Sequence, residues 1–534
     1  MMGHAAALFT VVAGAIVAFW SWLGAPVDNP PGPFAGTEKL ACVSYAPFRG
    51  DQNPFGPDVP IDPRQIEEDL AALKQITDCI RTYSVDHGLD QIPEIARRHD
   101  LKVMQGLWLS SLPDLSRKQI EGAVALANRF PDVIQSVIVG NEVLLRGEMS
   151  APALAQTIRE VKAQVPMPVT YADVWEFWLR NRELATAVDF ITIHVLPYWE
   201  DIPIPAAAAA PHVDAIRNQV TAAFPGKEVF IGEFGWPSAG RMREGALPSP
   251  ASQSRSLHEV LALARSQSFR VNLIEAYDQP WKRQLEGAVG GHWGLFDGYD
   301  RKLKFIWGAP ISNHPNWQFQ AAMGIGLAAL VFGAGLFAGR SAQPQPVRKW
   351  LAIGFCAVVA GSLIGWTVEK AQVESLTIGD WLRSLSWAAV AILAPIVGAI
   401  AIVAGNGVPS FARVIGRPPD RVPMGVQNVF GALLVVLTVL AVEAALGLGF
   451  DPRYRDFPFA ALTGALVPFL VTTAWRMSFP RWRASAEIVA AVILALAAIY
   501  VFLNETAQNW QAAWFCMALL GLALILAQVR DEPS

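Results

Sequence analysis

Long uncharged runs of apolar residues are the feature that most restricts how this chain can fold. Residues 313–534 carry 25 charged side chains, whereas residues 1–312 carry 63. Several apolar runs in the second part reach the roughly 20 residues that a helix needs to cross a bilayer. A composition with 53% hydrophobic and 16% charged residues is also unlike that of several soluble domains. We therefore expect a globular part joined to a part that lies in lipid.

Eight apolar segments are predicted to span a membrane. We interpret the first, Ala5–Leu23, as an anchor rather than a removed signal peptide, because no Lys or Arg precedes it and Gly24-Ala25-Pro26 is a poor cleavage site. The other seven are Trp317–Gly339, Trp350–Val368, Trp381–Gly405, Val426–Phe450, Phe457–Trp475, Ala484–Leu503 and Trp510–Val529. The expected domains are an anchor and linker over 1–33, a globular domain over 34–312, and a membrane domain with about seven transmembrane helices over 313–534.

Positive side chains in the connecting loops indicate the orientation, because Lys and Arg remain on the cytoplasmic side. One set of alternate loops carries ten of them: Arg340, Arg348, Lys349, Arg413, Arg417, Arg421, Arg476, Arg481, Arg483 and Arg530. The other set carries four: Lys370, Arg383, Arg453 and Arg455. We therefore expect both termini in the cytoplasm and the globular domain on the extracytoplasmic (periplasmic) side of the plasma (inner) membrane.

Charge and cysteine usage exclude several functions. A net charge of −4 offers no basic surface for a nucleic acid. The histidines form no HExxH or HxH arrangement, so we expect no metal and no cofactor. We expect Cys42 and Cys79 to be free buried thiols, although they could pair if the domain is exported, and Cys356 and Cys516 to act as small apolar residues. Glu443, inside a predicted span, is interpreted as a partner in an interhelical hydrogen bond.

Residues 38–310 alternate short apolar runs with amphipathic helical stretches, which is the pattern of a parallel sheet covered by helices. Eight such units in about 270 residues fit a (β/α)8 (TIM) barrel. A doubly wound open sheet is the alternative, but no glycine-rich turn follows the first strand. The predicted strands are 40–48, 79–85, 101–109, 136–144, 168–175, 190–198, 228–236 and 271–281, and the clearest helices are 64–76, 116–130, 151–165 and 252–267. The overall fold class is therefore an α/β barrel followed by an all-α multi-span membrane domain.

Polar and aromatic residues gather where these strands end, which is where barrel enzymes place their chemistry. Carboxylates and many aromatic rings at one mouth suit a sugar polymer. Retaining cleavage of a glycosidic bond needs an acid and a carboxylate about 5–5.5 Å apart. Glu142 ends the fourth strand and Glu233 ends the seventh, so the two can approach a sugar from opposite sides, with Asn141 placed to bond the 2-hydroxyl. The alternative is that either glutamate is an ordinary strand-end residue in a structural ion pair.

The two glutamates lie in the segments IVGNEV at 138–143 and IGEFGWPSAG at 231–240. The first resembles the acid/base motif, and the second the nucleophile signature, of glycoside hydrolase family 17, the β-1,3-glucan-active enzymes. The likeness extends through RTYSV, EAYDQPWK and HWGLFD and covers most of residues 38–307. The resemblance implies Glu142 as general acid/base and Glu233 as nucleophile. It leaves the membrane part unexplained.

The chain departs from the family at Gln279, where fungal-like members often have Glu, and at Gly290 and Gly291, where an acidic residue is common. Both departures lie beside the reducing-side groove, so they bear on which glycosidic linkage the enzyme prefers and which acceptor it uses. We expect five residues to position the sugar ring at the cleavage point: Tyr45, Arg81, Tyr83, Tyr198 and Glu275. We expect three indole rings to form the flanking subsites: Trp236, Trp281 and Trp293. Indole rings on the acceptor side would favour transfer, with core packing as the alternative for each of Trp175, Trp178, Trp199, Trp281 and Trp293.

These observations predict a membrane-bound retaining transglycosylase or hydrolase that remodels an exported or envelope β-glucan, with transfer slightly preferred. The expected partners are a β-glucan oligo- or polysaccharide and the lipid bilayer, and a glucan synthase or export machinery would suit the location. The alternatives are a non-catalytic glucan-binding sensor and a glucan export component whose spans are the functional core. Intact Glu142 and Glu233 argue against a non-catalytic barrel.

Overall fold

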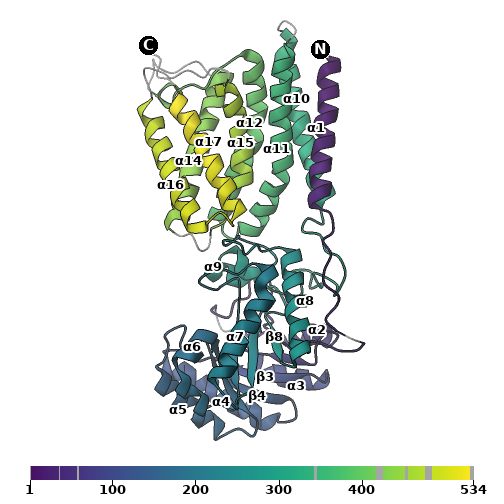
Figure 1. Ribbon diagram of the computed structural model, residues 1–534, viewed down its shortest axis with the longest axis vertical. Helices are drawn as coiled ribbons and strands as arrows, with labels where there is room; N and C mark the ends of the chain where they lie inside the picture. Colours follow the sequence, from purple (N-terminus) through teal and green to yellow (C-terminus); the bar gives the residue numbers. More distant parts are fainter. Residues whose placement is uncertain are drawn as a thin grey trace. The chain divides into compact units, whose positions relative to one another are not determined.

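The computed structural model describes residues 2–34, 36–56, 59–341, 345–416, 425–450, 455–474 and 484–529. Contacts divide the chain into two compact units (Figure 1). One comprises residues 27–239 and 246–311 and contains the eight β-strands of the described residues. The other comprises residues 1–26, 240–245 and 312–534 and contains the long apolar helices.

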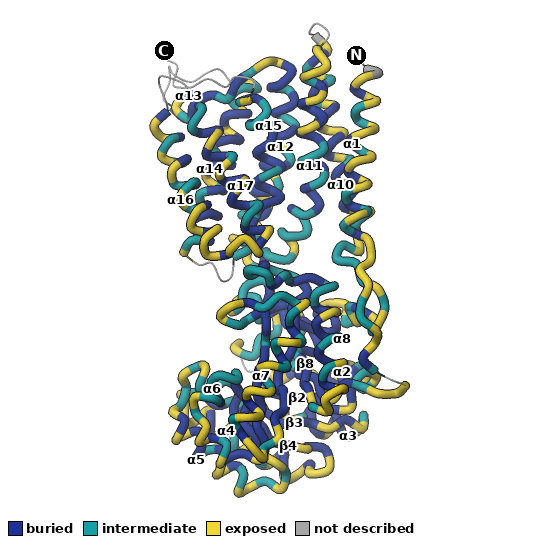
Figure 2. The backbone as a smooth tube through the Cα atoms, viewed as in Figure 1, coloured by how far each residue is buried: buried dark blue, intermediate teal, exposed yellow. Residues whose placement is uncertain are grey.

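The first unit is a closed barrel of eight parallel strands in sequential order. The strands are β1 (Cys42–Ser44), β2 (Cys79–Arg81), β3 (Lys102–Leu107), β4 (Ile134–Asn141), β5 (Val169–Val174), β6 (Ile191–His194), β7 (Val229–Phe234) and β8 (Val271–Leu273). The pairing of β1 with β8 closes the sheet, so the expected (β/α)8 barrel is confirmed and the doubly wound sheet is excluded. Strands β2 and β8 are buried throughout, and β3 and β4 are buried except at Lys102 and Gln135 (Figure 2).

Helices follow the strands because their sequences have one apolar face. In α2, Ile66, Leu70 and Leu73 are buried, and the carboxylate of Asp62 caps the first turn. The barrel helices are α2 (Pro63–Leu73), α3 (Ile92–Arg98), α4 (Pro113–Arg129), α5 (Ala151–Lys162), α6 (Trp175–Arg180), α7 (Ala209–Ala223), α8 (Pro250–Gln267) and α9 (Arg283–Glu286). The described residues also form the 3-10 turns η1 (Leu89–Gln91), η2 (Arg182–Thr186), η3 (Ala206–Ala208), η4 (Pro280–Lys282), η5 (Ala288–Gly291) and, after the barrel, η6 (Gly339–Ser341).

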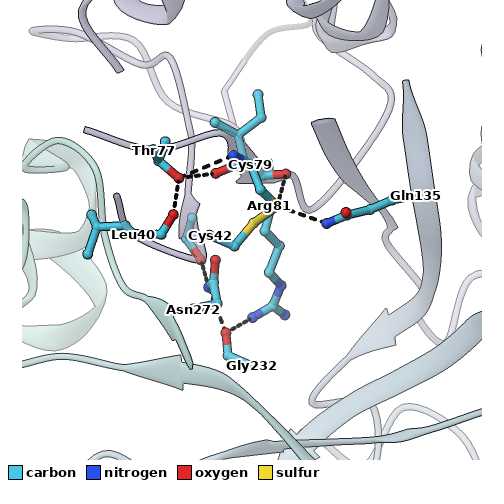
Figure 3. The surroundings of a disulfide bond; sticks show 10 residues. Leu40, Cys42, Thr77, Cys79, Arg81, Gln135, Gly232 and Asn272 are labelled. Carbon is cyan, nitrogen blue, oxygen red and sulfur yellow. Dashed lines mark hydrogen bonds between the residues drawn. A yellow bond between two sulfur atoms is a disulfide. The ribbon is translucent and has the colours of Figure 1, made fainter. Parts of the chain in front are cut away.

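Cys42 and Cys79 form a disulfide at the start of β1 and β2 (Figure 3). The expectation of two free thiols is therefore wrong. These strands are neighbours, and the register that pairs Val43 with Ile80 brings the preceding cysteines side by side, with their Cα atoms 4.5 Å apart. The bond lies among apolar side chains such as Met104 and Phe230. Sequence periodicity predicts each strand separately but not the register between them, which decides whether two cysteines meet.

The second unit contains seven described helices that are long and apolar enough to cross a membrane. They are α1 (Met2–Leu23), α10 (Trp317–Ala338), α11 (Val347–Glu374), α12 (Ile378–Ala404), α14 (Val426–Phe450), α16 (Ser485–Glu505) and α17 (Trp510–Gln528). The segment expected over 457–475 contains α15 (Phe459–Ala474), an apolar helix of 16 residues that is shorter than the others, and α13 (Phe411–Ile415) is a short connecting helix. Helix α1 packs against α10 and α11, where Ile16 contacts the small residues Gly324 and Gly361.

Glu443 of α14 forms an ion pair with Arg455, with Oε1 2.7 Å from Nη1. Arg455 lies in the segment before α15, so the expected hydrogen bond between two helices is corrected to a bond with a connecting segment. Cys356 and Cys516 are free and buried in their helices, as expected. Several residues used to predict the orientation lie outside the described residues: Arg417, Arg421, Arg453, Arg476, Arg481, Arg483 and Arg530.

Candidate active site

Glu142 and Glu233 meet at the carboxyl-terminal ends of the barrel strands. Glu142 directly follows β4, and Glu233 is the fifth residue of β7. One carboxylate oxygen of each glutamate and one ring nitrogen of His194 all lie within 4.8 Å of one another. Parallel strands in a closed barrel direct their ends to one mouth, which is how residues from β4, β6 and β7 come together.

Glu233 is held as a carboxylate by the groups around it. Arg81 Nη1 donates to Oε1 over 3.0 Å, and the Tyr83 hydroxyl donates to the same oxygen over 2.8 Å. Burial by itself would raise the pKa of Glu233, but His194, Arg81 and the Tyr83 hydrogen bond outweigh burial and hold this pKa below its ordinary value. Burial and the Glu233 charge raise the pKa of Tyr83, so its hydroxyl remains a donor.

The buried guanidinium of Arg81 connects three strands at this mouth. Arg81 ends β2, its Nη1 donates to the carbonyl of Gly232 in β7 over 2.7 Å, and its Nη2 donates to Oδ1 of Asn141 in β4 over 2.5 Å. The bond to Asn141 fixes which side of the amide is oxygen, so Nδ2 faces the other way. Arg81 therefore orients both the amide and the Glu233 carboxylate.

Glu142 is more open than Glu233, with 22% of its side chain exposed against 5%. Its Oε1 lies 2.8 Å from Nδ1 of His194, which ends β6. The other ring nitrogen, Nε2, lies 3.4 Å from both terminal nitrogens of Arg81. Nε2 also lies 3.6 Å from Oε1 of Glu233, so the imidazole of His194 stands between the two glutamates, with Nδ1 within hydrogen-bonding distance of Glu142.

Glu275 and Lys282 form a second buried ion pair close to Glu233, with Oε2 2.7 Å from Nζ. Burial is the main reason that the pKa of Glu275 is raised to about 7, although Lys282 opposes it. Burial would lower the pKa of Lys282, but the charges of Glu275 and Glu286 reverse this and raise it. The Lys282 charge also lowers the pKa of Glu233.

The aromatic residues expected around the sugar differ in how far they are buried. Tyr198 and Trp236 are fully buried, and Trp236 Nε1 donates to the Leu247 carbonyl. Trp293 is also buried and stacks on the partly buried Trp199 with an angle of 10° between the rings. These positions place Tyr198 and Trp236 in the packing of the barrel rather than on an open surface.

Trp281 is partly buried, and its ring meets Phe48 and Phe55 edge-on. Trp178 is buried, with Nε1 donating to the Thr192 carbonyl, so core packing describes it. Trp175 is partly buried, with Nε1 3.3 Å from Glu200.

The described contacts of Tyr45 include neither Glu142 nor Glu233. It is buried, and its hydroxyl donates to Asp69 over 3.0 Å. Asp69 also pairs with Arg49 and Arg301. Gln279, one of the departures from the family pattern, is buried and donates to the carbonyls of Ala46 and Tyr277.

Sequence analysis gave no role to His194, Asp173 or Lys282, which surround the pair. His194 ends β6 and Asp173 lies one residue before the end of β5, and the signal available in the sequence was a polar residue after a short apolar run. The three ligand atoms of Glu142, His194 and Glu233 are close enough together to hold a metal ion. Arg81, however, already places its positive charge on Oε1 of Glu233, and a second cation there would be repelled.

A family model described as the BtgE/BtgC glycoside hydrolase domain matches residues 42–294, which include all eight strands. The chain carries a BtgE/BtgC glycoside hydrolase domain. This domain is related to the family 17 β-1,3-glucanases that the sequence motifs resemble. The long apolar helices lie outside the matched residues.

Curated relatives share this domain rather than the whole chain. A probable glucan endo-1,3-beta-glucosidase btgC of Aspergillus clavatus is 28% identical over 301 residues, which cover 49% of this chain and 41% of that protein. A glucan 1,3-beta-glucosidase of Arthroderma benhamiae is 28% identical over 264 residues, which cover 46% of this chain and 84% of that protein. The chain thus spans less than half the length of the first of these relatives.

Among solved structures, a family 17 β-1,3-glucanosyltransferase from Rhizomucor miehei is 26% identical, with a TM-score of 0.45, and the match covers 51% of this chain and 99% of that one. An active-site mutant of the Rhizomucor miehei β-1,3-glucanosyltransferase in complex with laminaritriose is 25% identical, with a TM-score of 0.44.

Proposed function

We propose that this chain is a membrane-bound retaining enzyme that acts on a β-1,3-type glucan. The observation that carries the proposal is the pair of carboxylates at the barrel mouth, whose oxygens lie within 4.8 Å of each other. That approach suits a retaining enzyme, since an inverting one keeps its carboxyl groups farther apart to admit a water. The relationship of the domain to β-1,3-glucanases supports the substrate class.

In the first step, Glu233 attacks the anomeric carbon of the sugar while the carboxyl group of Glu142 gives its proton to the departing glycosidic oxygen. A bond from Glu233 to the sugar forms, and the bond to the leaving sugar breaks. The described hydrogen bonds to Glu233 all fall on Oε1, so Oε2 is the attacking atom. Asn141 offers its Nδ2 hydrogens to the 2-hydroxyl.

In the second step, Glu142 removes a proton from the incoming hydroxyl group as its oxygen attacks the anomeric carbon, and Glu233 leaves as a carboxylate. The incoming hydroxyl belongs to water in hydrolysis and to a second sugar in transfer. We favour transfer, because the partly buried rings of Trp199 and Trp281 are suited to hold an acceptor sugar by stacking. Glu275, with Lys282, positions the ring beside Glu233.

The location proposed for the barrel is the extracytoplasmic side of the plasma membrane, with both chain termini in the cytoplasm. The loop charges support this orientation, and the Cys42–Cys79 disulfide supports it independently, because disulfides persist in oxidising compartments. The substrate would then be an exported or envelope glucan, and a glucan synthase or export machinery would be a suitable neighbour.

The experiment that tests the proposal incubates the detergent-solubilised chain with laminari-oligosaccharides and resolves the products by size. Longer and shorter oligosaccharides together support transfer, and shorter ones alone support hydrolysis. We expect Glu233→Ala to abolish both, and Glu228→Ala, at the opposite end of the same strand in a surface ion pair with Arg270, to leave the products unchanged. Unaltered turnover in Glu233→Ala, or no turnover in the unmodified chain, would favour the glucan-binding sensor.

A further inference from the structure

Asp173, near the end of β5, is a buried carboxylate to which the proposed reaction assigns no role. It is fully buried, and its described contacts include no Lys or Arg side chain. An unpaired carboxylate is costly to bury, so an ordinary structural ion pair does not explain it. Burial is the main reason that its pKa is raised to about 6, and the charge of Glu142 raises it further.

The turn that carries Glu142 has an unusual backbone. Glu142 has a φ of 53°, a left-handed conformation that costs a residue with a Cβ about 1 kcal/mol or more. Such a conformation persists only where surrounding contacts hold it. The Glu142 amide donates to the Ala172 carbonyl of β5, and the Arg146 side chain donates to the Asn141 carbonyl on the other side.

Asp173 adds side-chain contacts to this turn. Its Oδ2 accepts from the backbone amide of Leu144 at 3.2 Å and, more distantly, from that of Leu145 at 3.4 Å. The Tyr171 hydroxyl, on the same strand, donates to Oδ2 and lies 3.0 Å from the Leu144 amide. Burial and the Asp173 charge raise the pKa of Tyr171, so this hydroxyl keeps its hydrogen. Oδ1 accepts from the amide of Val174 over 2.8 Å.

We infer that Asp173, supported by Tyr171, is a positioning residue that holds the turn after β4 so that the Glu142 carboxyl group faces the scissile oxygen. The inference rests on the proposed function, because it assumes Glu142 as the acid/base. Asp173 touches no reacting atom and acts through the backbone of residues 144 and 145. Its loss therefore impairs the step that needs proton transfer and spares the attack by Glu233.

The test compares two donors on the intact solubilised chain. Laminari-oligosaccharides need a proton on the leaving oxygen, whereas a 2,4-dinitrophenyl β-laminaribioside releases a stable phenolate without one. In Asp173→Asn the amide presents hydrogens where the carboxylate accepts, so at least one backbone amide loses its acceptor. We expect kcat on oligosaccharides to fall about 10- to 100-fold, as for a catalytic group displaced by about 1 Å, with KM little changed.

With the activated donor, the burst of dinitrophenolate in Asp173→Asn should stay near that of the unmodified chain, since it depends on Glu233. Tyr171→Phe should show the same pattern with a smaller loss. Asp189→Asn is the matched control, because Asp189 also accepts a backbone amide, that of Val169 at the start of the same strand, and should leave both reactions unchanged.

Glu142→Ala provides the reference. If Glu142→Ala no longer turns over oligosaccharides, keeps the burst of dinitrophenolate and regains activity when azide is added, the proposed roles of Glu142 and Glu233 stand. An Asp173→Asn variant that then matches the unmodified chain, or that loses burst and turnover equally, overturns the positioning inference alone. If Glu142→Ala shows no such dependence on the leaving group, the proposed function fails and the inference fails with it.

Discussion

At the scale of residues, the surroundings of two similar carboxylates separate their proposed tasks. Glu233 is buried and receives donors from Arg81 and Tyr83, which favour its charged form, as a nucleophile requires. Glu142 is more exposed, and its Oε1 lies 2.8 Å from Nδ1 of His194, beside the open mouth where a leaving oxygen would arrive. One guanidinium, that of Arg81, reaches both Glu233 and Asn141.

Glu275 makes stability depend on pH. Its pKa is about 7 in the folded barrel against an ordinary 4.5, so the folded state binds this proton more tightly. The resulting stability is fully present below about pH 4.5 and is lost as pH rises through 7, by roughly 3 kcal/mol in total. We expect the thermal midpoint of the solubilised chain to fall between pH 5 and 8, and Glu275→Gln to flatten that fall. An equally steep fall in Glu275→Gln would contradict the assignment.

The positions of both carboxylates could be predicted from the sequence, because each follows a clear apolar strand and the ends of parallel strands meet at one mouth. The side chains that contact these carboxylates could not be predicted in the same way. The contact of His194 with Glu142 depends on the register between strands and on side-chain rotamers. The burial of Tyr198 and Trp236 depends on how loops pack over the rings, which no periodicity in the chain reports.

At the scale of elements, strand and helix alternation predicted all eight barrel strands, because buried parallel strands and amphipathic helices have distinct periods. The same reasoning missed the disulfide, since two cysteines on different strands meet only when the register between β1 and β2 is known. It also began the segment around α15 at Phe457, two residues before the helix begins at Phe459.

The disulfide should stabilise the barrel by joining its first two strands. Closing a loop of this size typically contributes about 2–5 kcal/mol. We expect Cys42→Ser or a reductant to lower the thermal midpoint of the solubilised chain. A chain with Cys356→Ala and Cys516→Ala should keep its response to reductant, because those thiols are free. No response in the unmodified chain would show that the bond contributes little.

At the scale of the whole molecule, a catalytic barrel is joined to a set of helices that suits a multi-pass membrane protein. Helix α1 packs among α10 and α11 through small residues rather than standing alone. This packing supports a retained first span, because its removal would expose the Gly324 and Gly361 contacts.

The proposed orientation predicts where substrate must be supplied. Laminari-oligosaccharides added to sealed right-side-out membrane vesicles should be processed without detergent, since the barrel would face the medium. Inside-out vesicles should need detergent, and Glu233→Ala vesicles of either kind should be inactive. Activity in sealed inside-out vesicles alone would place the barrel in the cytoplasm.

The central claim is that Glu233 forms a covalent bond to the sugar while Glu142 handles the proton. A 2-deoxy-2-fluoro-laminaribiosyl fluoride tests it directly, because fluorine slows release of the glycosyl-enzyme and its good leaving group needs no acid. Mass spectrometry of digested, inactivated chain should find one added glycosyl group on the peptide that contains Glu233, also in Glu142→Ala. A label on Glu142, or no covalent adduct in a chain that turns over glucan, would contradict the account.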